Sequence, residues 1–214
     1  MDPKKLRKAL SQLNWQKAYR MRKHGLETKF VLSDTGFPDP DFEKALGLFN
    51  ASGGTALDIG CGTGELSIQL AGRGFSVLGI DVTRDAIDAS IENARKAGVH
   101  CTFNVLNFLD YDEPIQYDLI VDRGCFTVLG ESYDPEYFDN LLRRLKTGGL
   151  FLIKSDHSKK KEGKLLALRK FSESNLDRVL EWKTSYVRSD AKELEALFFG
   201  GIKAGVGLRG FIAV

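Results

Sequence analysis

A glycine-rich segment that follows a short apolar run constrains the fold of this chain more than any other feature. The mostly apolar run 56–59, Ala-Leu-Asp-Ile, leads into Gly60, Gly62 and Gly64, and a helix is predicted to begin near Glu65. Because glycine has no Cβ, the backbone can take positive φ there and lie close to a ligand. The helix start directs free N–H groups toward the same turn. The segment therefore predicts a strand, a tight turn and a helix with a ligand site between them.

A second apolar run, residues 75–80, ends at Asp81. A carboxylate at this spacing is placed to accept hydrogen bonds from two ribose hydroxyls. The glycine spacing also indicates which adenosine ligand fits. The dinucleotide pattern G-x-G-x-x-G would need a glycine at position 65, where Glu65 would face a pyrophosphate of the same charge. An adenosine site is therefore predicted, and NAD is disfavoured.

Strand-like and helix-like segments alternate along the rest of the chain. Near-continuous apolar strands separated by helices indicate a parallel sheet covered on both faces. Near the C-terminus, Gly200 and Gly201 with Gly205 and Gly207 indicate a turn-rich stretch, which either borders the site or links two strands. Helices are predicted at 84–97 (capped by Thr83 and stopped by Gly98), 135–146 and 190–199, and further strands at 100–105, 117–122, 150–153, 182–187 and 208–214.

Composition is consistent with a single cytoplasmic domain. The chain has 214 residues, 43% of them hydrophobic, and contains no long linker or internal repeat. A net charge of +2 gives no strong indication of nucleic-acid binding, and no apolar stretch approaches the length of a membrane span. The three cysteines form no Cys-x-x-Cys pair and the histidines lack metal-ligand spacing, so we expect a reducing compartment and no metal. A monomer or a small homo-oligomer is expected.

The pattern hydrophobic-Asp-x-Gly-x-Gly-x-Gly at 57–64 resembles the first motif of class I S-adenosylmethionine-dependent methyltransferases, whose ligand carries no phosphate. The resemblance is close over residues 52–155. It implies an α/β, Rossmann-like fold with a mostly parallel seven-stranded sheet in the order 3-2-1-4-5-7-6, flanked by helices. It also implies S-adenosylmethionine as cofactor and S-adenosylhomocysteine as product.

The resemblance also implies site residues. Asn107 would face the adenine amine and Phe108 its ring, unless they belong to an ordinary loop. Asp122 and Arg123, at the end of the fourth strand, would hold the methionine end, with a capping carboxylate as the alternative for Asp122. The predicted cofactor-binding residues are Tyr19, Asp58, Gly60, Cys61, Gly62, Gly64, Asp81, Val82, Asn107, Phe108, Asp122 and Arg123.

Residues 122–126, Asp-Arg-Gly-Cys-Phe, resemble the small-molecule, thiopurine-like branch of the family. Thr127 stands where a histidine often follows in that branch, so no catalytic residue is assigned, and Cys125 is expected to be a packed thiol. Residues 1–50 are predicted to form a helical arm. Its Trp15 and Tyr19 either cover the cofactor or serve as packing aromatics. Residues 51–214 would form the methyltransferase domain.

A sulfonium methyl group is already a strong electrophile, so the protein's main task would be to align it with an acceptor. Three functions stay open. The first is methyl transfer to a small molecule. The second is methylation of protein lysine, because a similar Asp-Arg-Gly-x-Phe segment occurs in elongation-factor lysine methyltransferases. The third is a module that binds the cofactor without turnover. The Asn/Asp-Pro-Pro-Tyr signature is absent at 122–125, which disfavours adenine and glutamine as acceptors.

Overall fold

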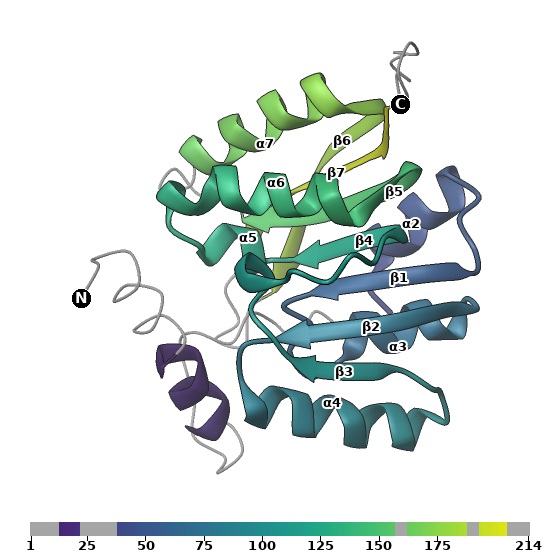
Figure 1. Cartoon of the computed structure of the whole chain (residues 1–214), viewed down its shortest axis with the longest axis vertical. Coiled ribbons are helices and arrows are strands. Elements are labelled where there is room, and N and C mark those ends of the chain that lie inside the picture. Colours follow the sequence, from purple (N-terminus) through teal and green to yellow (C-terminus); the bar gives the residue numbers. More distant parts are fainter. Residues whose placement is uncertain (1–12, 22–37, 157–161, 188–192, 205–214) are drawn as a thin grey trace.

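The fold is a seven-stranded sheet with helices packed against it (Figure 1). The structure, a computed structural model, describes residues 13–21, 38–156, 162–187 and 193–204. The strand order is β3-β2-β1-β4-β5-β7-β6, which confirms the predicted order. The strands are β1 (Gly54–Ile59), β2 (Phe75–Asp81), β3 (Thr102–Val105), β4 (Tyr117–Arg123), β5 (Leu145–Asp156), β6 (Leu176–Val187) and β7 (Glu193–Lys203).

Parallel pairing brings the ends of the first strands to one edge of the sheet. β1 pairs in parallel with β2 on one side and with β4 on the other, so that Ile59 lies beside both Ile80 and Asp122. β7 runs antiparallel to both β5 and β6. The strand order therefore reverses between β1 and β4, where α/β sheets of this type bind ligands.

Helices cover both faces of the sheet, as the apolar strand pattern predicts. The shorter elements η1 and η2 are turns of 3-10 helix. Residues 13–21 are also helical. The remaining elements are α2 (Pro40–Leu48), α3 (Glu65–Gly72), α4 (Arg84–Ala97), η1 (Phe108–Asp110), α5 (Cys125–Val128), η2 (Glu131–Tyr133), α6 (Asp134–Arg144) and α7 (Glu162–Asn175).

Two large apolar clusters lie on opposite faces of the sheet. On one face, Tyr137 of α6 and Leu168 of α7 are fully buried against strand residues such as Phe151. On the other face, Phe42 of α2 and Leu70 of α3 are equally buried. Each fully buried large side chain contributes about 1.5–3 kcal/mol to folding. These two layers hold the strand ends in place.

The helix predicted at 190–199 is wrong over the residues that the structure describes, because residues 193–199 belong to β7. Its residues include Glu, Leu and Ala, which favour helices locally, but pairing with β5 and β6 on both sides overrides that preference. Gly200 and Gly201 are inside this strand, and a Cβ on Gly200 would lie 2.6 Å from a Leu152 methyl group. They therefore permit close packing instead of forming a turn. The strand predicted at 208–214 lies outside the described residues.

Smaller differences concern element ends. The helix predicted to reach residue 146 ends at Arg144, and β5 starts at Leu145, well before the predicted residue 150. α4 ends at Gly98 with φ +69°, as predicted. Thr83 occupies the N-cap position of α4, but its side chain makes no capping bond. No helix in the described part of the chain is long and apolar enough to cross a membrane.

Candidate functional site

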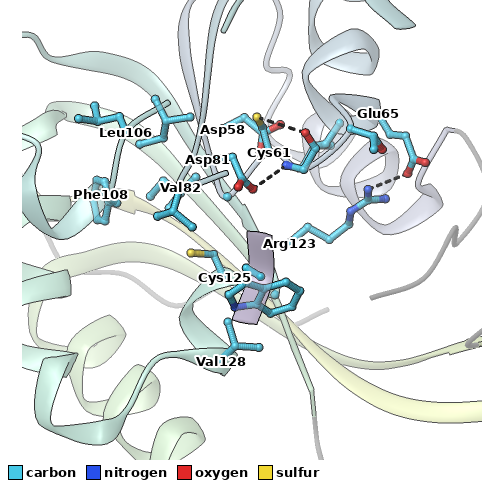
Figure 2. A pocket seen from close by; sticks show the side chains of 18 of the residues that line it. Asp58, Cys61, Glu65, Asp81, Val82, Leu106, Phe108, Arg123, Cys125 and Val128 are labelled. Atoms are coloured by element: carbon cyan, nitrogen blue, oxygen red, sulfur yellow. Dashed lines mark hydrogen bonds and ion pairs between the residues drawn. The ribbon is translucent and has the colours of Figure 1, made fainter. Parts of the chain in front are cut away.

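A pocket opens at the strand ends where the order of the sheet reverses (Figure 2). Its volume, including space open to solvent, is about 950 Å³, which is at the upper end of the range for small-molecule sites. The lining residues come from helix 13–21, from the ends of β1, β2 and β4 and the segments that follow them, and from the segment after β3: Trp15, Tyr19, Asp58, Ile59, Gly60, Cys61, Gly62, Thr63, Glu65, Leu66, Ile80, Asp81, Val82, Leu106, Phe108, Arg123, Gly124, Cys125 and Val128.

The turn after β1 presents bare backbone to this pocket at Gly62. Gly62 has φ +55°, a conformation that L side chains rarely adopt. A Cβ on this residue would lie 2.7 Å from the Tyr19 hydroxyl oxygen. A side chain here would therefore be strained and would also fill the space between the turn and helix 13–21.

Gly60 and Gly64 are required for packing. A Cβ on Gly60 would lie 2.7 Å from the Cβ of Cys125, at the start of α5. A Cβ on Gly64 would lie 2.8 Å from the Cβ of Ser90 on α4. Gly64 does not line the pocket, although it caps the N-terminus of α3. Of the three glycines, only Gly62 directs the space that a Cβ would occupy toward Tyr19.

Asp81 is held at the pocket wall by the turn and by Thr83. Its Oδ2 accepts a 3.2 Å hydrogen bond from the Gly62 N–H. Its Oδ1 accepts bonds from the Thr83 N–H and hydroxyl, both at 2.9 Å. The carboxyl is 8% exposed, and burial raises its pKa while these donors oppose the shift. Thr83 therefore orients the predicted ribose acceptor instead of capping α4.

Two further carboxylates lie beneath the turn. Asp58 is 1% exposed and accepts a 2.6 Å bond from the Ser67 hydroxyl, and burial raises its pKa to about 6. Asp122 is fully buried, and burial raises its pKa to about 7. It accepts hydrogen bonds from the Tyr137 hydroxyl at 2.7 Å and from two N–H groups at the start of α5. Its side chain therefore caps α5 and does not line the pocket.

One end of the pocket is apolar. Val82 follows β2, and Leu106 and Phe108 follow β3; all three line the pocket, and Figure 2 shows them together on one side of Asp81. Asn107 does not line it, because its Oδ1 accepts a 3.0 Å bond from the Leu109 N–H and caps η1. The described geometry therefore offers a flat apolar ring a surface at Phe108, next to a ribose-binding carboxylate.

Helix 13–21 covers the turn from the other side. Trp15 and Tyr19 lie one helical turn apart, with ring centroids separated by 6.5 Å, and both line the pocket. Arg20 Nε lies 3.6 Å from the Asp85 carboxylate in the first turn of α4. The helix thus contacts the domain through an aromatic pair over the pocket and an ion pair beside it.

The end of β4 carries a charged pair into the pocket. Arg123 Nη2 donates a 2.8 Å hydrogen bond to Glu65 Oε2 at the start of α3. Arg123 Nη1 also lies 3.8 Å from Oδ2 of the buried Asp39, which in turn lies 3.2 Å from Lys154 Nζ. Lys154 makes a second ion pair with Asp41 at 2.7 Å. A row of acidic and basic side chains that alternate in charge therefore holds Arg123 at one end of the pocket.

The side of the pocket formed by α5 is weakly polar. Cys125 and Val128 line it at the two ends of this short helix. Burial raises the pKa of the Cys61 and Cys125 thiols well above their usual range, so both remain protonated near neutral pH. This favours the packed role over a nucleophilic one. Among the residues that the structure describes, no group of His, Cys, Asp and Glu could hold a metal ion.

Comparison with known proteins gives the family. A family model described as a methyltransferase domain matches residues 50–197. The chain belongs to this methyltransferase family. With the strand order of the sheet and the motif at 57–64, the match confirms the predicted class I S-adenosylmethionine-dependent methyltransferase fold and its cofactor.

Curated relatives of this methyltransferase differ in their acceptors. The chain is 28% identical over 106 residues to a ubiquinone biosynthesis O-methyltransferase of Rickettsia conorii, and the match covers 49% of this chain and 36% of that protein. It is 33% identical over 128 residues to human EEF1A lysine methyltransferase 2, covering 56% and 52%. The methyltransferase thus spans about a third to a half of the length of these two curated relatives.

A solved structure supports the fold over nearly the whole chain. The 1,6-didemethyltoxoflavin-N1-methyltransferase of Burkholderia thailandensis, solved with its substrate and S-adenosylhomocysteine, superposes with a TM-score of 0.74. The match covers 96% of this methyltransferase and 92% of that chain at 16% identity. At this identity the likeness concerns the fold.

The structure brings most of the predicted site residues of this methyltransferase together. Three of them, Gly64, Asn107 and Asp122, do not line the pocket. Gly64 allows α4 to pack closely, the Asn107 side chain caps η1, and the Asp122 side chain caps α5. Sequence reasoning did not include Glu65, whose ion pair with Arg123 joins residues far apart in the chain. Those that line the pocket are Tyr19, Asp58, Gly60, Cys61, Gly62, Asp81, Val82, Phe108 and Arg123.

Proposed function

We propose that this chain transfers a methyl group from S-adenosylmethionine to a small-molecule acceptor. The observation that carries the proposal is the pocket at the reversal of strand order, where bare backbone at Gly62 lies beside the buried Asp81 carboxylate. A cofactor without phosphate suits this site, because Glu65 stands where the dinucleotide-binding pattern requires a glycine. Phe108 and Asp81 would hold its adenosine, and the end of β4 its methionine portion.

When bound, the cofactor supplies a methyl group on a positively charged sulfur, which makes that carbon open to attack by an acceptor lone pair. The protein's own contribution is alignment and exclusion of water. Trp15 and Tyr19 form a cover above the turn, and the apolar Val128 borders the pocket beside Cys125. Well-oriented reactants gain up to about 7–11 kcal/mol from such positioning, so this site can act without a nucleophilic side chain.

An uncharged acceptor suits the pocket better than a protonated amine. The carboxylates that line the described pocket are already engaged: Asp58 with Ser67, Asp81 with Thr83, and Glu65 with Arg123. The wall at α5 offers Cys125 and Val128. This arrangement supports a small molecule with an apolar body and a nucleophilic atom.

We further propose that, within the predicted arm of residues 1–50, the helix at 13–21 covers the cofactor, whereas α2 packs in the core of the domain comprising residues 51–214. The position of Tyr19 above Gly62 supports this role for the described helix. The proposal predicts that removing the helix would weaken cofactor binding without unfolding the domain.

Protein lysine is the second candidate acceptor. The 33% identity to human EEF1A lysine methyltransferase 2 specifically favours it. In that case a lysine side chain would enter past Trp15, and its positive charge would be stabilised by the aromatic faces there.

Two experiments test the proposed function. S-Adenosylhomocysteine at a hundredfold excess over its dissociation constant should stabilise the folded chain by about 2.7 kcal/mol and raise its melting temperature, whereas NAD should not. Stabilisation by NAD alone would refute the proposed cofactor. Transfer of labelled methyl from S-adenosylmethionine, at a concentration well below that needed to saturate Asp81→Ala, is then screened against small thiols, phenols and amines, and against cell-extract protein, with Asp81→Ala as a control that should transfer less label. Label on protein alone would favour the lysine acceptor.

A further inference from the structure

Helix α6 contacts two walls of the pocket although none of its own residues, Asp134–Arg144, lines it. Its side chains Tyr137 and Asn140 are buried. Residues three positions apart lie on one face of a helix, so these two side chains are neighbours. Their partners are Phe108 at the apolar end of the pocket and the start of α5 at the opposite wall.

The apolar end is held by both side chains. Asn140 Nδ2 donates hydrogen bonds to the backbone oxygens of Phe108 at 3.0 Å and of Leu109 at 3.1 Å. The Tyr137 ring meets the Phe108 ring edge to face, with centroids 5.2 Å apart and planes at 65°. Helix α6 therefore fixes both the backbone and the side chain of Phe108.

The wall at α5 is held by the Tyr137 hydroxyl alone. This hydroxyl donates a 2.7 Å hydrogen bond to Asp122 Oδ2. Asp122 in turn accepts bonds from the N–H groups of Cys125 at 2.7 Å and Phe126 at 2.9 Å, which begin α5. Because Asp122 is fully buried, these protein donors set the orientation of its carboxylate. The hydroxyl of Tyr137 thereby helps to fix the first turn of α5.

We propose that Tyr137 and Asn140 are positioning residues for methyl transfer. Asn140 holds the surface at Phe108 against which the base of the cofactor would lie, and the Tyr137 hydroxyl holds the wall of α5 that faces the acceptor. This inference rests on the proposed function, which assigns these two ends to cofactor and acceptor. Because alignment is the protein's main contribution to such a reaction, a support shared by both ends matters for it.

The test follows each end of the pocket by its own readout in the full chain. Calorimetric titration with S-adenosylhomocysteine reports on the end at Phe108. Amide hydrogen exchange of Cys125 and Phe126, followed by NMR, reports on α5, because these two N–H groups are the donors to Asp122.

The first variant, Tyr137→Phe, keeps the ring and removes the hydroxyl. Exchange of the Cys125 and Phe126 amides should become about tenfold faster or more, because a hydrogen bond to a charged group is lost. The affinity for S-adenosylhomocysteine should stay within about twofold, since the ring contact with Phe108 is kept.

The second variant, Asn140→Asp, keeps the size of the side chain and its acceptor for Arg143, but places an oxygen against two backbone oxygens. It should weaken S-adenosylhomocysteine about tenfold and leave exchange in α5 within about twofold. Asn140→Ala removes the donor without adding a charge. It should weaken binding about threefold or more, and it tests the same contact if the aspartate variant does not fold.

Tyr117→Phe is the matched control for Tyr137→Phe. The Tyr117 hydroxyl is also hydrogen-bonded inside the protein, at 2.6 Å from the Tyr111 hydroxyl, and neither tyrosine lines the pocket. This control should change neither the affinity nor the exchange of the α5 amides. Thermal melts verify that each variant folds.

The outcomes separate this inference from the proposed function. Unchanged exchange at α5 in Tyr137→Phe, or unchanged affinity in the Asn140 variants, would overturn the positioning roles. Parallel changes of both readouts in every variant would also overturn them, because a general loss of packing would then suffice. A wild-type chain that does not bind S-adenosylhomocysteine would overturn the proposed function, whereas exchange in Tyr137→Phe would still decide the contact with α5.

Discussion

Replacing Asp81 by alanine should remove the ribose-binding carboxylate and weaken S-adenosylhomocysteine strongly. The carboxylate is 8% exposed and is oriented by Thr83 and Gly62, so a ribose hydroxyl would find it preorganised. A hydrogen bond to a charged group contributes about 1.5–3 kcal/mol. The expected loss in affinity is therefore roughly 10- to 150-fold.

Isothermal titration with S-adenosylhomocysteine measures this loss, and a thermal melt verifies that the variant folds. The stability change should be modest, because alanine loses three hydrogen bonds but also removes a carboxyl whose pKa burial raises. Asp88→Ala is the control, since Asp88 on the neighbouring α4 is 53% exposed and does not line the pocket. Unchanged affinity in Asp81→Ala, or an equal change in both variants, would refute the role of Asp81.

Three other perturbations follow from the geometry. Gly62→Ala should weaken the binding of S-adenosylhomocysteine, because the new Cβ would lie in the pocket close to Tyr19. Gly98→Ala also places alanine at positive φ, but the space around its Cβ is open, so it should cost only about 1 kcal/mol of stability. Titration and thermal melts of both variants therefore separate the effect of the clash from that of backbone strain. Adding Tyr19→Phe to Gly62→Ala should recover part of the binding, because the hydroxyl 2.7 Å from the new Cβ is gone, and no recovery in titration would contradict the contact. Burial raises the pKa of Asp122 to about 7, above its unfolded value near 4, so the folded state binds this proton more tightly than the unfolded state. The free energy of unfolding should therefore fall as pH rises from about 4 to about 7, by up to about 1.4 kcal/mol per pH unit. Chemical denaturation across pH 4–8 should show a shallower fall for Asp122→Asn, and an identical slope would contradict the shift.

Local patterns predicted the half of the fold that contains the pocket. The turn at 60–64 and the carboxylate at Asp81 follow from glycine chemistry and from apolar runs that lie close together in the sequence. Strand β7 was mispredicted because the helix preference of residues 193–197 is a local property, whereas its pairing with β5 and β6 is not. Helix α7 was not predicted, although Leu165, Leu168 and Phe171 recur at helical spacing and are buried.

The site shows the same division between local and distant effects. The pairing of Arg123 with Glu65 joins residues 58 positions apart, and no sequence pattern indicates it. Asn107 was assigned to the cofactor by family resemblance, yet in this chain its side chain caps η1. The glycine pattern predicted that Gly60, Gly62 and Gly64 would all contact the cofactor. At position 64, however, glycine is needed because α4 packs directly against the backbone there. Packing across the sheet decides such roles.

The most direct test of the central claim is a crystal structure of the chain with S-adenosylhomocysteine. We expect the ribose hydroxyls within hydrogen-bond distance of Asp81 and the thioether chain against the backbone at Gly60 and Gly62. Ligand density at another place on the protein, or a ribose that does not contact Asp81, would contradict the account.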